Sequence, residues 1–181
     1  MRPAIVFIHE ILDNCPLVGA EIGVAAGDHA REILECLDIK KLYLIDIWES
    51  YLQNGVAVDC YFNYYEAVVD EFSHYRNVEI LREYSTFAAS KVPDELDFVY
   101  IDGNHEYEAV KEDILHWYPK IRIGGILSGH DYYTQWPGII EAVNEFVDMH
   151  NCNLYKAIDR PIASAEYHLV NNNCDWWIVK K

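Results

Sequence analysis

The stretch Glu21-Ile22-Gly23-Val24-Ala25-Ala26-Gly27 decides the fold of this chain. It follows an apolar run that begins near Val18, and it precedes a helical pattern that begins near His29. Glycine removes the side chain where backbone approaches a ligand, and nucleotides bind at the carboxyl end of the first strand in an open α/β sheet. The stretch therefore predicts a strand, a ligand-binding loop and a helix in succession.

The glycine spacing separates this loop from a dinucleotide-binding loop, in which Gly-x-Gly-x-x-Gly seats a pyrophosphate on a helix N-terminus. Here Glu21 stands two residues before Gly23, and Asp28 and Glu32 add negative charge at the helix start. These charges would repel a pyrophosphate and attract a cation such as a sulfonium group. An ordinary strand-to-helix turn is the alternative explanation for the two glycines.

A further acidic residue, Asp46, ends the next apolar run. It follows the glycine loop by about twenty residues, where a carboxylate can accept hydrogen bonds from both ribose hydroxyls. The loop and Asp46 together favour an adenosine ligand. A helix cap or a solvated strand end is the alternative role of Asp46.

The rest of the chain alternates short apolar runs with longer amphipathic ones, which is typical of a parallel sheet wrapped by helices. We predict an α/β, doubly wound, mostly parallel seven-stranded sheet with a C-terminal antiparallel hairpin and helices on both faces. The chain is expected to form one domain over residues 1–181, with an N-terminal helix within 1–17 and the core in 18–181. The expected strands are 18–24, 41–46, 77–81, 96–101, 121–128, 154–158 and 176–179, and the expected helices are 4–14, 29–37, 59–75, a turn at 87–88, 106–118 and 139–149.

Composition limits the class of partner. The formal net charge of −16 would repel a phosphate backbone, so we expect no nucleic-acid partner. No apolar run approaches the ~20 residues that span a bilayer, so we expect no membrane partner. The five cysteines form no Cys-x-x-Cys pair, which favours free thiols in a reducing cytoplasm.

Four stretches together carry a family resemblance: residues 21–27, 44–46, 97–105 and 124–131. With them the chain resembles the class I S-adenosylmethionine (SAM)-dependent methyltransferases from about Val18 to the final hairpin. The pattern Ile101-Asp102-Gly103-x-His105-x-Tyr107-x-x-Val110-x-x-Asp113, followed by Gly124-Gly125 and His130-Asp131, is most similar to the small-molecule O-methyltransferases, including those that modify macrolide sugars.

The resemblance implies SAM as cofactor and a small-molecule acceptor. It implies that Glu21 and Gly23 line the methionine part of SAM and that Asp46 holds the ribose. It also implies that Asp102 faces the transferred methyl group. The cofactor-binding residues expected from the resemblance are Glu21, Gly23, Gly27, Asp46, Glu83, Tyr84, Ser85 and Asp102.

A second set of polar residues, Asp102, His105, His130 and Asp131, follows the fourth and fifth expected strands. We expect Asp102, His105 and Asp131 to be catalytic. Asp102 and Asp131 are candidate ligands of Mg²⁺ or another divalent cation. The metal-dependent catechol-type relatives carry an Asp-Asn pair where this chain has Asp131-Tyr132. A metal-free site with His105 as general base is therefore an alternative, as is a local capping role for the two histidines.

Aromatic residues gather after the second and fifth expected strands, where they could contact a sugar or aromatic acceptor or simply fill the core. They are Trp48, Tyr51, Tyr61, Tyr64, Tyr65, Tyr132, Tyr133 and Trp136. The pair Trp176-Trp177 is expected to pack the edge hairpin or a contact between copies in a homo-oligomer.

The predicted function is methyl transfer from SAM to a hydroxyl of a small molecule. A SAM-binding sensor or assembly subunit without catalysis is the first alternative. A nicotinamide-dependent oxidoreductase is the second, disfavoured because the pyrophosphate-binding glycine pattern is absent.

Overall fold

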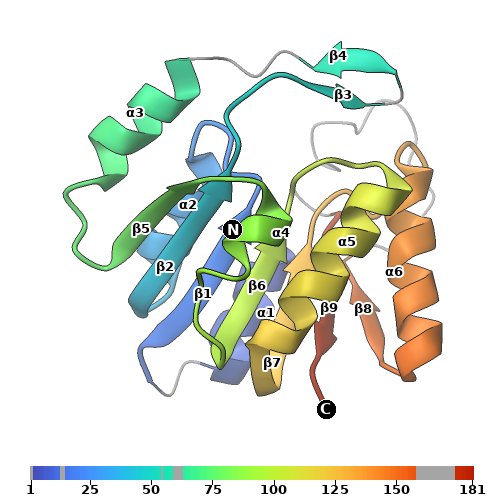
Figure 1. Cartoon of the computed structure of the whole chain (residues 1–181). Coiled ribbons are helices and arrows are strands. Elements are labelled where there is room, and N and C mark those ends of the chain that lie inside the picture. The colour runs from blue at the N-terminus through green and yellow to red at the C-terminus, as the bar shows by residue number, and fades with distance from the viewer. Residues whose placement is uncertain (1, 13–14, 54, 59–62, 158–173) are drawn as a thin grey trace, which may run out of the picture.

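One seven-stranded sheet organises the computed structural model, which describes residues 2–12, 15–53, 55–58, 63–157 and 174–181. The strands lie in the order β5-β2-β1-β6-β7-β9-β8 (Figure 1). Five are parallel, whereas β9 runs antiparallel to both of its neighbours. The predicted sheet and its antiparallel edge are thereby confirmed. The strands are β1 Leu17–Ile22, β2 Ile39–Asp46, β5 Val78–Arg82, β6 Leu96–Ile101, β7 Ile121–Gly129, β8 Leu154–Lys156 and β9 Trp176–Val179.

Helices cover both faces of the sheet because its parallel strands are apolar on both sides. In β6, Val99 and Ile101 face one hydrophobic cluster, and Phe98 and Tyr100 face the other. The first cluster lies under α4, α5 and α6, and the second lies under α1, α2 and α3. The helices are α1 Pro3–Leu12, α2 Asp28–Cys36, α3 Asn63–Phe72, α4 Ser85–Ala88, α5 Tyr107–Trp117 and α6 Pro137–His150.

Two local features differ from the sequence-based prediction. A two-stranded antiparallel hairpin, β3 Tyr51–Gln53 with β4 Val56–Val58, lies above the carboxyl edge of the sheet (Figure 1). It was not predicted, because its short strands offer no measurable period. The chain also continues past the end of α5 as a 3₁₀ turn, Tyr118–Lys120, because proline fits the first positions of a helical turn.

The ends of three predicted elements lie outside the described residues: residues 13–14 and 59–62 of two helices, and Ile158 of a strand. The tryptophan pair packs the edge of the sheet: Trp176 is 1% exposed, and the Trp177 ring stacks on Tyr155 with the ring of Phe7 nearby.

Among the helices of the described chain, none is long and apolar enough to cross a membrane.

Candidate active site

The glycine loop follows β1 and contacts the ends of the two neighbouring strands, β2 and β6. The Gly23 N–H donates to the carbonyl oxygen of Ile45, and a Cβ at position 23 would lie 2.1 Å from the carbonyl oxygen of Asp102. Gly23 also has φ +85°, in the region that favours glycine. Gly27, with φ +84°, starts α2 and packs against the ring of Phe72. Both glycines are therefore required by backbone geometry.

Asp46 fixes this loop from the end of β2. Its Oδ2 accepts hydrogen bonds from the backbone N–H groups of Val24 and Ala25, each at 2.9 Å. Its Oδ1 accepts one from the Trp48 N–H at 2.8 Å. A carboxylate has about four acceptor positions, so the side chain can still accept hydrogen bonds from a ligand.

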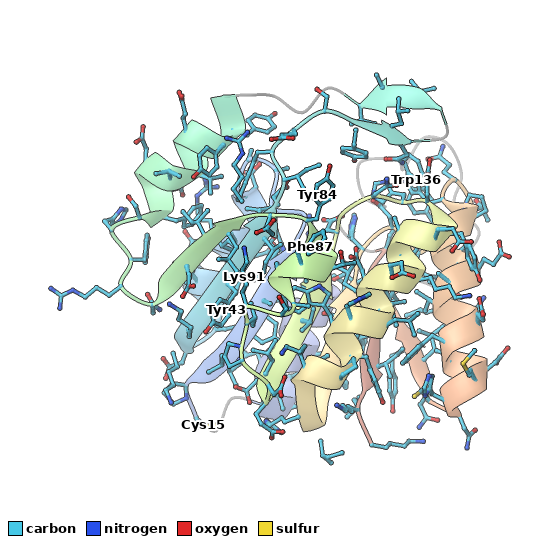
Figure 2. All side chains as sticks on the ribbon, in the orientation of Figure 1. Cys15, Tyr43, Tyr84, Phe87, Lys91 and Trp136 are labelled. Carbon is cyan, nitrogen blue, oxygen red and sulfur yellow. The ribbon has the colours of Figure 1, made fainter. Side chains whose placement is uncertain are left out.

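A cavity of about 480 Å³ opens along the carboxyl edge of the sheet, a size typical of small-molecule sites. Its wall includes most of the cofactor-binding residues expected from the sequence, but neither Glu21 nor Gly27. The expected residues that line it are Gly23, Asp46, Glu83, Tyr84, Ser85 and Asp102. Tyr84 is 59% exposed and lies at the start of α4, below the hairpin in the view of Figure 2.

The structure corrects the expected place of Glu21. This side chain is 1% exposed and points away from the cavity to His29, whose Nδ1 lies 3.0 Å from Glu21 Oε1. Burial raises the pKa of Glu21, although His29 opposes the shift. Side chains alternate between the faces of a strand, and position 21 faces the opposite side of the sheet from the α4 and α5 layer.

The other two acidic groups expected beside the loop are also engaged elsewhere. Glu32 Oε1 accepts the backbone N–H of Arg2 at 2.6 Å. The Asp28 side chain is 85% exposed and pairs with Arg31. The carboxyl groups available to attract a cationic ligand are therefore those that line the cavity, such as Asp46, Glu83 and Asp102.

A buried carboxyl to which the sequence analysis assigned no role, Asp113, lines the cavity beside Ser85. The Ser85 hydroxyl accepts a hydrogen bond from Trp117 Nε1 at 2.7 Å. Burial raises the pKa of Asp113 to about 7, and a hydrogen bond with Ser85 opposes the rise. The burial of Asp113 could have been predicted from the sequence, because Asp113 shares a helix face with the apolar residues Val110 and Trp117.

Replacing Asp113 with asparagine should stabilise the protein at high pH. A carboxyl whose folded pKa is raised loses stabilisation as pH increases from the unfolded value to the folded one, here from 3.8 to about 7. Asp113→Asn should gain roughly 2 to 4 kcal/mol over the wild type between pH 4 and pH 8. Urea unfolding at both pH values measures this, with Glu112→Gln as the neighbouring control. An equal difference at the two pH values would contradict the prediction.

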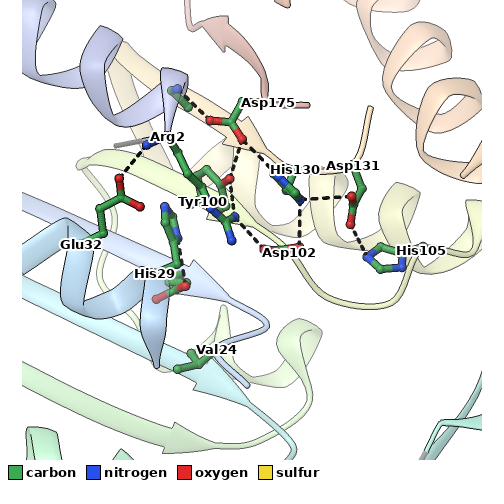
Figure 3. A network of polar contacts seen from close by, with 12 residues as sticks. Arg2, Val24, His29, Glu32, Tyr100, Asp102, His105, His130, Asp131 and Asp175 are labelled. Atoms are coloured by element: carbon green, nitrogen blue, oxygen red, sulfur yellow. Dashed lines mark hydrogen bonds and ion pairs between the residues drawn. The ribbon is translucent and has the colours of Figure 1, made fainter. Parts of the chain in front are cut away.

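The polar residues that follow β6 and β7 meet at one rim (Figure 3). Asp131 lies between two imidazoles: its Oδ1 is 3.1 Å from His130 Nδ1, and its Oδ2 is 3.1 Å from His105 Nε2. Asp102 Oδ1 lies 4.0 Å from His130 Nδ1. The four residues expected to cluster from the sequence are thus brought together.

Asp131 differs from the usual aspartate in both its backbone conformation and its pKa. It has φ +58°, a left-handed conformation that is uncommon outside glycine. Burial acts to raise the pKa of Asp131, but the contacts with His105 and His130 outweigh it and hold the pKa well below its usual value. Asp131 is therefore a carboxylate held in a fixed orientation.

His105 is oriented by the hairpin and by α6. Its Nδ1 lies 3.1 Å from Gln53 Nε2, and its ring lies 4.4 Å from the ring of Trp136. The Nε2 atom is buried and has no hydrogen-bond partner among the described residues, although Asp131 Oδ2 is close. Single ligand atoms from Asp102, His105 and Asp131 lie within 4.8 Å of one another, as a metal site requires.

Arg2 is the residue of this rim that the sequence analysis did not find. Its Nη1 donates to the Tyr100 hydroxyl at 2.7 Å and to Asp102 Oδ2 at 2.8 Å. No local sequence pattern marks an isolated arginine before the first helix. The contact of Arg2 with Asp102 can therefore be identified only from the tertiary structure.

The aromatic residues divide between core and cavity. Tyr51 and Tyr64 line the cavity, whereas Trp48 is fully buried and donates its indole N–H to the carbonyl oxygen of Ala25. Tyr65 packs against Trp48 at 5.2 Å. Tyr61 lies outside the described residues. Tyr51 and Tyr64 are therefore placed to contact a ligand in the cavity, and Trp136 lies beside His105 at the rim.

Comparison with known proteins gives one family match. The family model described as "Methyltransferase domain" matches residues 20–132, from within β1 to the residue after Asp131. The uncharacterized protein R132 of Acanthamoeba polyphaga mimivirus is 32% identical over 81 residues. That match spans 41% of this chain and only 37% of the length of the viral protein.

Solved structures share the fold. The O-methyltransferase NovP has a TM-score of 0.68 and 19% identity over 98% of this chain and 80% of its own. SMU.1697c from Streptococcus mutans, in complex with SAH, has a TM-score of 0.69 and 14% identity over 98% and 96%. An rRNA methylase from Streptococcus thermophilus has a TM-score of 0.63 and 16% identity over 97% and 91%. Structures with different acceptors thus share this architecture.

Proposed function

Because the chain belongs to the methyltransferase-domain family, whose cofactor is SAM, we propose that it transfers the methyl group of SAM to a hydroxyl of a small molecule. The observation that carries the proposal is the meeting of the cavity with the polar rim at Asp102. This residue lines the cavity and also belongs to the cluster that contains His105 and Asp131. Cofactor and acceptor chemistry would therefore meet at one side chain.

In this proposal SAM lies along the cavity. The backbone of Gly23 would contact its methionine part, and Asp46 would accept hydrogen bonds from the ribose hydroxyls. Glu83, Tyr84 and Ser85 would contact the adenine. Asp102, which lines the cavity and belongs to the polar cluster, would face the methyl group. Glu21 and Gly27 would act indirectly, through the shape of the loop.

The reaction is a displacement at the methyl carbon. The acceptor oxygen forms a bond to that carbon as the bond from carbon to sulfur breaks, and the electron pair stays on sulfur to give the neutral thioether SAH. The hydroxyl proton would pass to His105, which acts as general base. The protein contributes mainly by alignment, so the fixed orientations of Asp131 and His105 support this role.

The rim is alternatively suited to a divalent cation, in which case His105 would be a ligand of the ion and not the general base. Two carboxylates and an imidazole are an acceptable donor set for several divalent ions, and the donor atoms of Asp102, His105 and Asp131 lie within 4.8 Å of one another. Asp102, His105 and Asp131 would hold the ion. When bound, it would lower the pKa of the acceptor hydroxyl.

Mn²⁺ binding tests this site without an acceptor. Wild-type protein titrated with Mn²⁺ and followed by electron paramagnetic resonance should bind one ion. Asp131→Asn should weaken binding by about tenfold or more, because an anionic ligand is lost. Asp148→Asn, a change on α6 outside the cluster, should bind as the wild type does. Equal binding by all three proteins would refute a site at Asp131, and His105 would then act without metal.

Transfer itself is tested with methyl-labelled SAM. The protein should label hydroxylated sugars or phenols in a panel of small molecules and should leave an rRNA fragment unlabelled, because its net charge of −16 repels RNA. His105→Ala should lower the rate with the best acceptor. Labelling of RNA alone would overturn the acceptor class. SAM binding without transfer to any acceptor would favour a non-catalytic SAM-binding protein.

A further inference from the structure

A guanidinium group from the start of the chain lies against the candidate active site. Arg2 precedes α1, and its Nη1 contacts both the Tyr100 hydroxyl and Asp102 Oδ2 (Figure 3). Its backbone N–H donates to Glu32. The Arg2 side chain is 21% exposed and does not line the cavity, so it reaches the cavity only through Asp102.

Asp175 holds the same segment from the residue before β9. Its Oδ2 accepts the backbone N–H of Ala4 in the first turn of α1 at 2.8 Å. Its Oδ1 accepts the Tyr100 hydroxyl at 2.8 Å. Asp175 is 1% exposed, and a carboxylate at a helix N-terminus is favourable. These contacts fix Arg2 against the end of β6.

Arg2 is also the permanent cation of this network. Of the residues labelled in Figure 3, it is the only arginine or lysine, whereas Asp102, Asp131 and Asp175 are acidic. The imidazoles there carry charge only when protonated. The charge of Asp102 is therefore balanced directly by Arg2, through a contact of 2.8 Å.

We propose that Arg2 is a positioning residue that holds the Asp102 carboxylate in place and reduces its electrostatic attraction for the sulfonium of SAM. This inference rests on the proposed function, in which Asp102 faces the transferred methyl group. The sulfonium loses its positive charge during transfer. An unbalanced carboxylate would stabilise SAM more than the transition state and so slow the reaction. Arg2 prevents that imbalance.

The test compares the affinities for SAM and SAH, which differ in the charge at sulfur and need no acceptor. Isothermal titration calorimetry is run with a chelator present on the wild type, Arg2→Met and Arg2→Lys. In Arg2→Met the ratio of the Kd for SAH to the Kd for SAM should rise about fivefold, the effect of one unit charge several ångströms away. In Arg2→Lys the charge is kept, so the ratio should stay within about twofold of the wild-type value.

Arg122 provides the matched control. Its Nε lies 2.7 Å from Asp97 Oδ1 at the other end of β6, so Arg122→Met removes a similar ion pair far from the cavity. Its ratio should equal that of the wild type. Adding Asp102→Asn to Arg2→Met should abolish the rise, since the carboxylate that attracts the sulfonium is gone.

The outcomes separate this inference from the proposed function. If Arg2→Met leaves the ratio of the two Kd values unchanged or lowers it, Arg2 does not offset the charge of Asp102 and the inference fails. If the wild type binds neither compound, the proposed function itself fails. Arg2→Gln is the second neutral variant should Arg2→Met not fold by circular dichroism, and the same fivefold rise is expected of it.

Discussion

Asp46→Ala is expected to lower the affinity for SAM by about 100-fold or more. A hydrogen bond to a charged group contributes roughly 1.5 to 3 kcal/mol, and the variant would lose those to the ribose. It would also release the backbone N–H groups of Val24 and Ala25, which Asp46 now holds at 2.9 Å. Titration calorimetry with SAM measures the change.

Two further variants separate the roles of Asp46. Asp46→Asn keeps one acceptor oxygen and should lie between the wild type and Asp46→Ala in affinity. The Asp28 side chain lies near the same loop and is 85% exposed. Asp28→Ala should therefore bind SAM as the wild type does. A Kd for SAM within threefold of wild type in Asp46→Ala would show that this carboxylate does not hold the ribose.

Gly23→Ala is expected to lower the free energy of unfolding by at least about 3 kcal/mol, more than alanine at Gly103 or Gly55. The new Cβ would lie 2.1 Å from the carbonyl oxygen of Asp102 and 2.6 Å from the Gly103 nitrogen. These are backbone atoms, so the clash can be relieved only by separating β1 from β6. Urea unfolding measures the loss.

Two other glycines isolate the causes. A Cβ at Gly103 would meet its nearest neighbour at 3.7 Å, an ordinary contact, so Gly103→Ala should change the unfolding free energy by less than about 1 kcal/mol. Gly55 has φ +74° with nothing within 4 Å, so Gly55→Ala should show only the backbone cost of about 1 to 2 kcal/mol. A Gly23→Ala protein no less stable than Gly55→Ala would contradict the strand contact.

The sheet could be predicted from the sequence because buried parallel strands are continuous apolar runs. The bounds of β6 and β9 agree with the predicted strands 96–101 and 176–179. The hairpin of β3 and β4 could not be predicted, because each of its strands has three residues and pairs only with the other among the described residues.

The candidate site could be predicted where its residues stand at strand ends. Asp46, Asp102 and Asp131 follow apolar runs, and parallel strands bring their carboxyl ends to one edge. The direction of Glu21 depends on which face of β1 meets the α4 and α5 layer, and this is a property of the assembled layers. The contact of Arg2 with Asp102 joins positions 100 residues apart, and no local pattern marks Arg2 as the partner of Asp102.

The position of β9 between β7 and β8 sets an order for folding. Strand β8 precedes β9 in the chain, yet within the described sheet it hydrogen-bonds to β9 and not to β7. It therefore joins the rest of the sheet only through β9, which pairs with β7 through residues such as Ile178 and Leu127. That pairing closes a loop of about fifty residues, and such distant contacts form slowly. The edge of the sheet nearest α6 is thus completed out of chain order and late in folding.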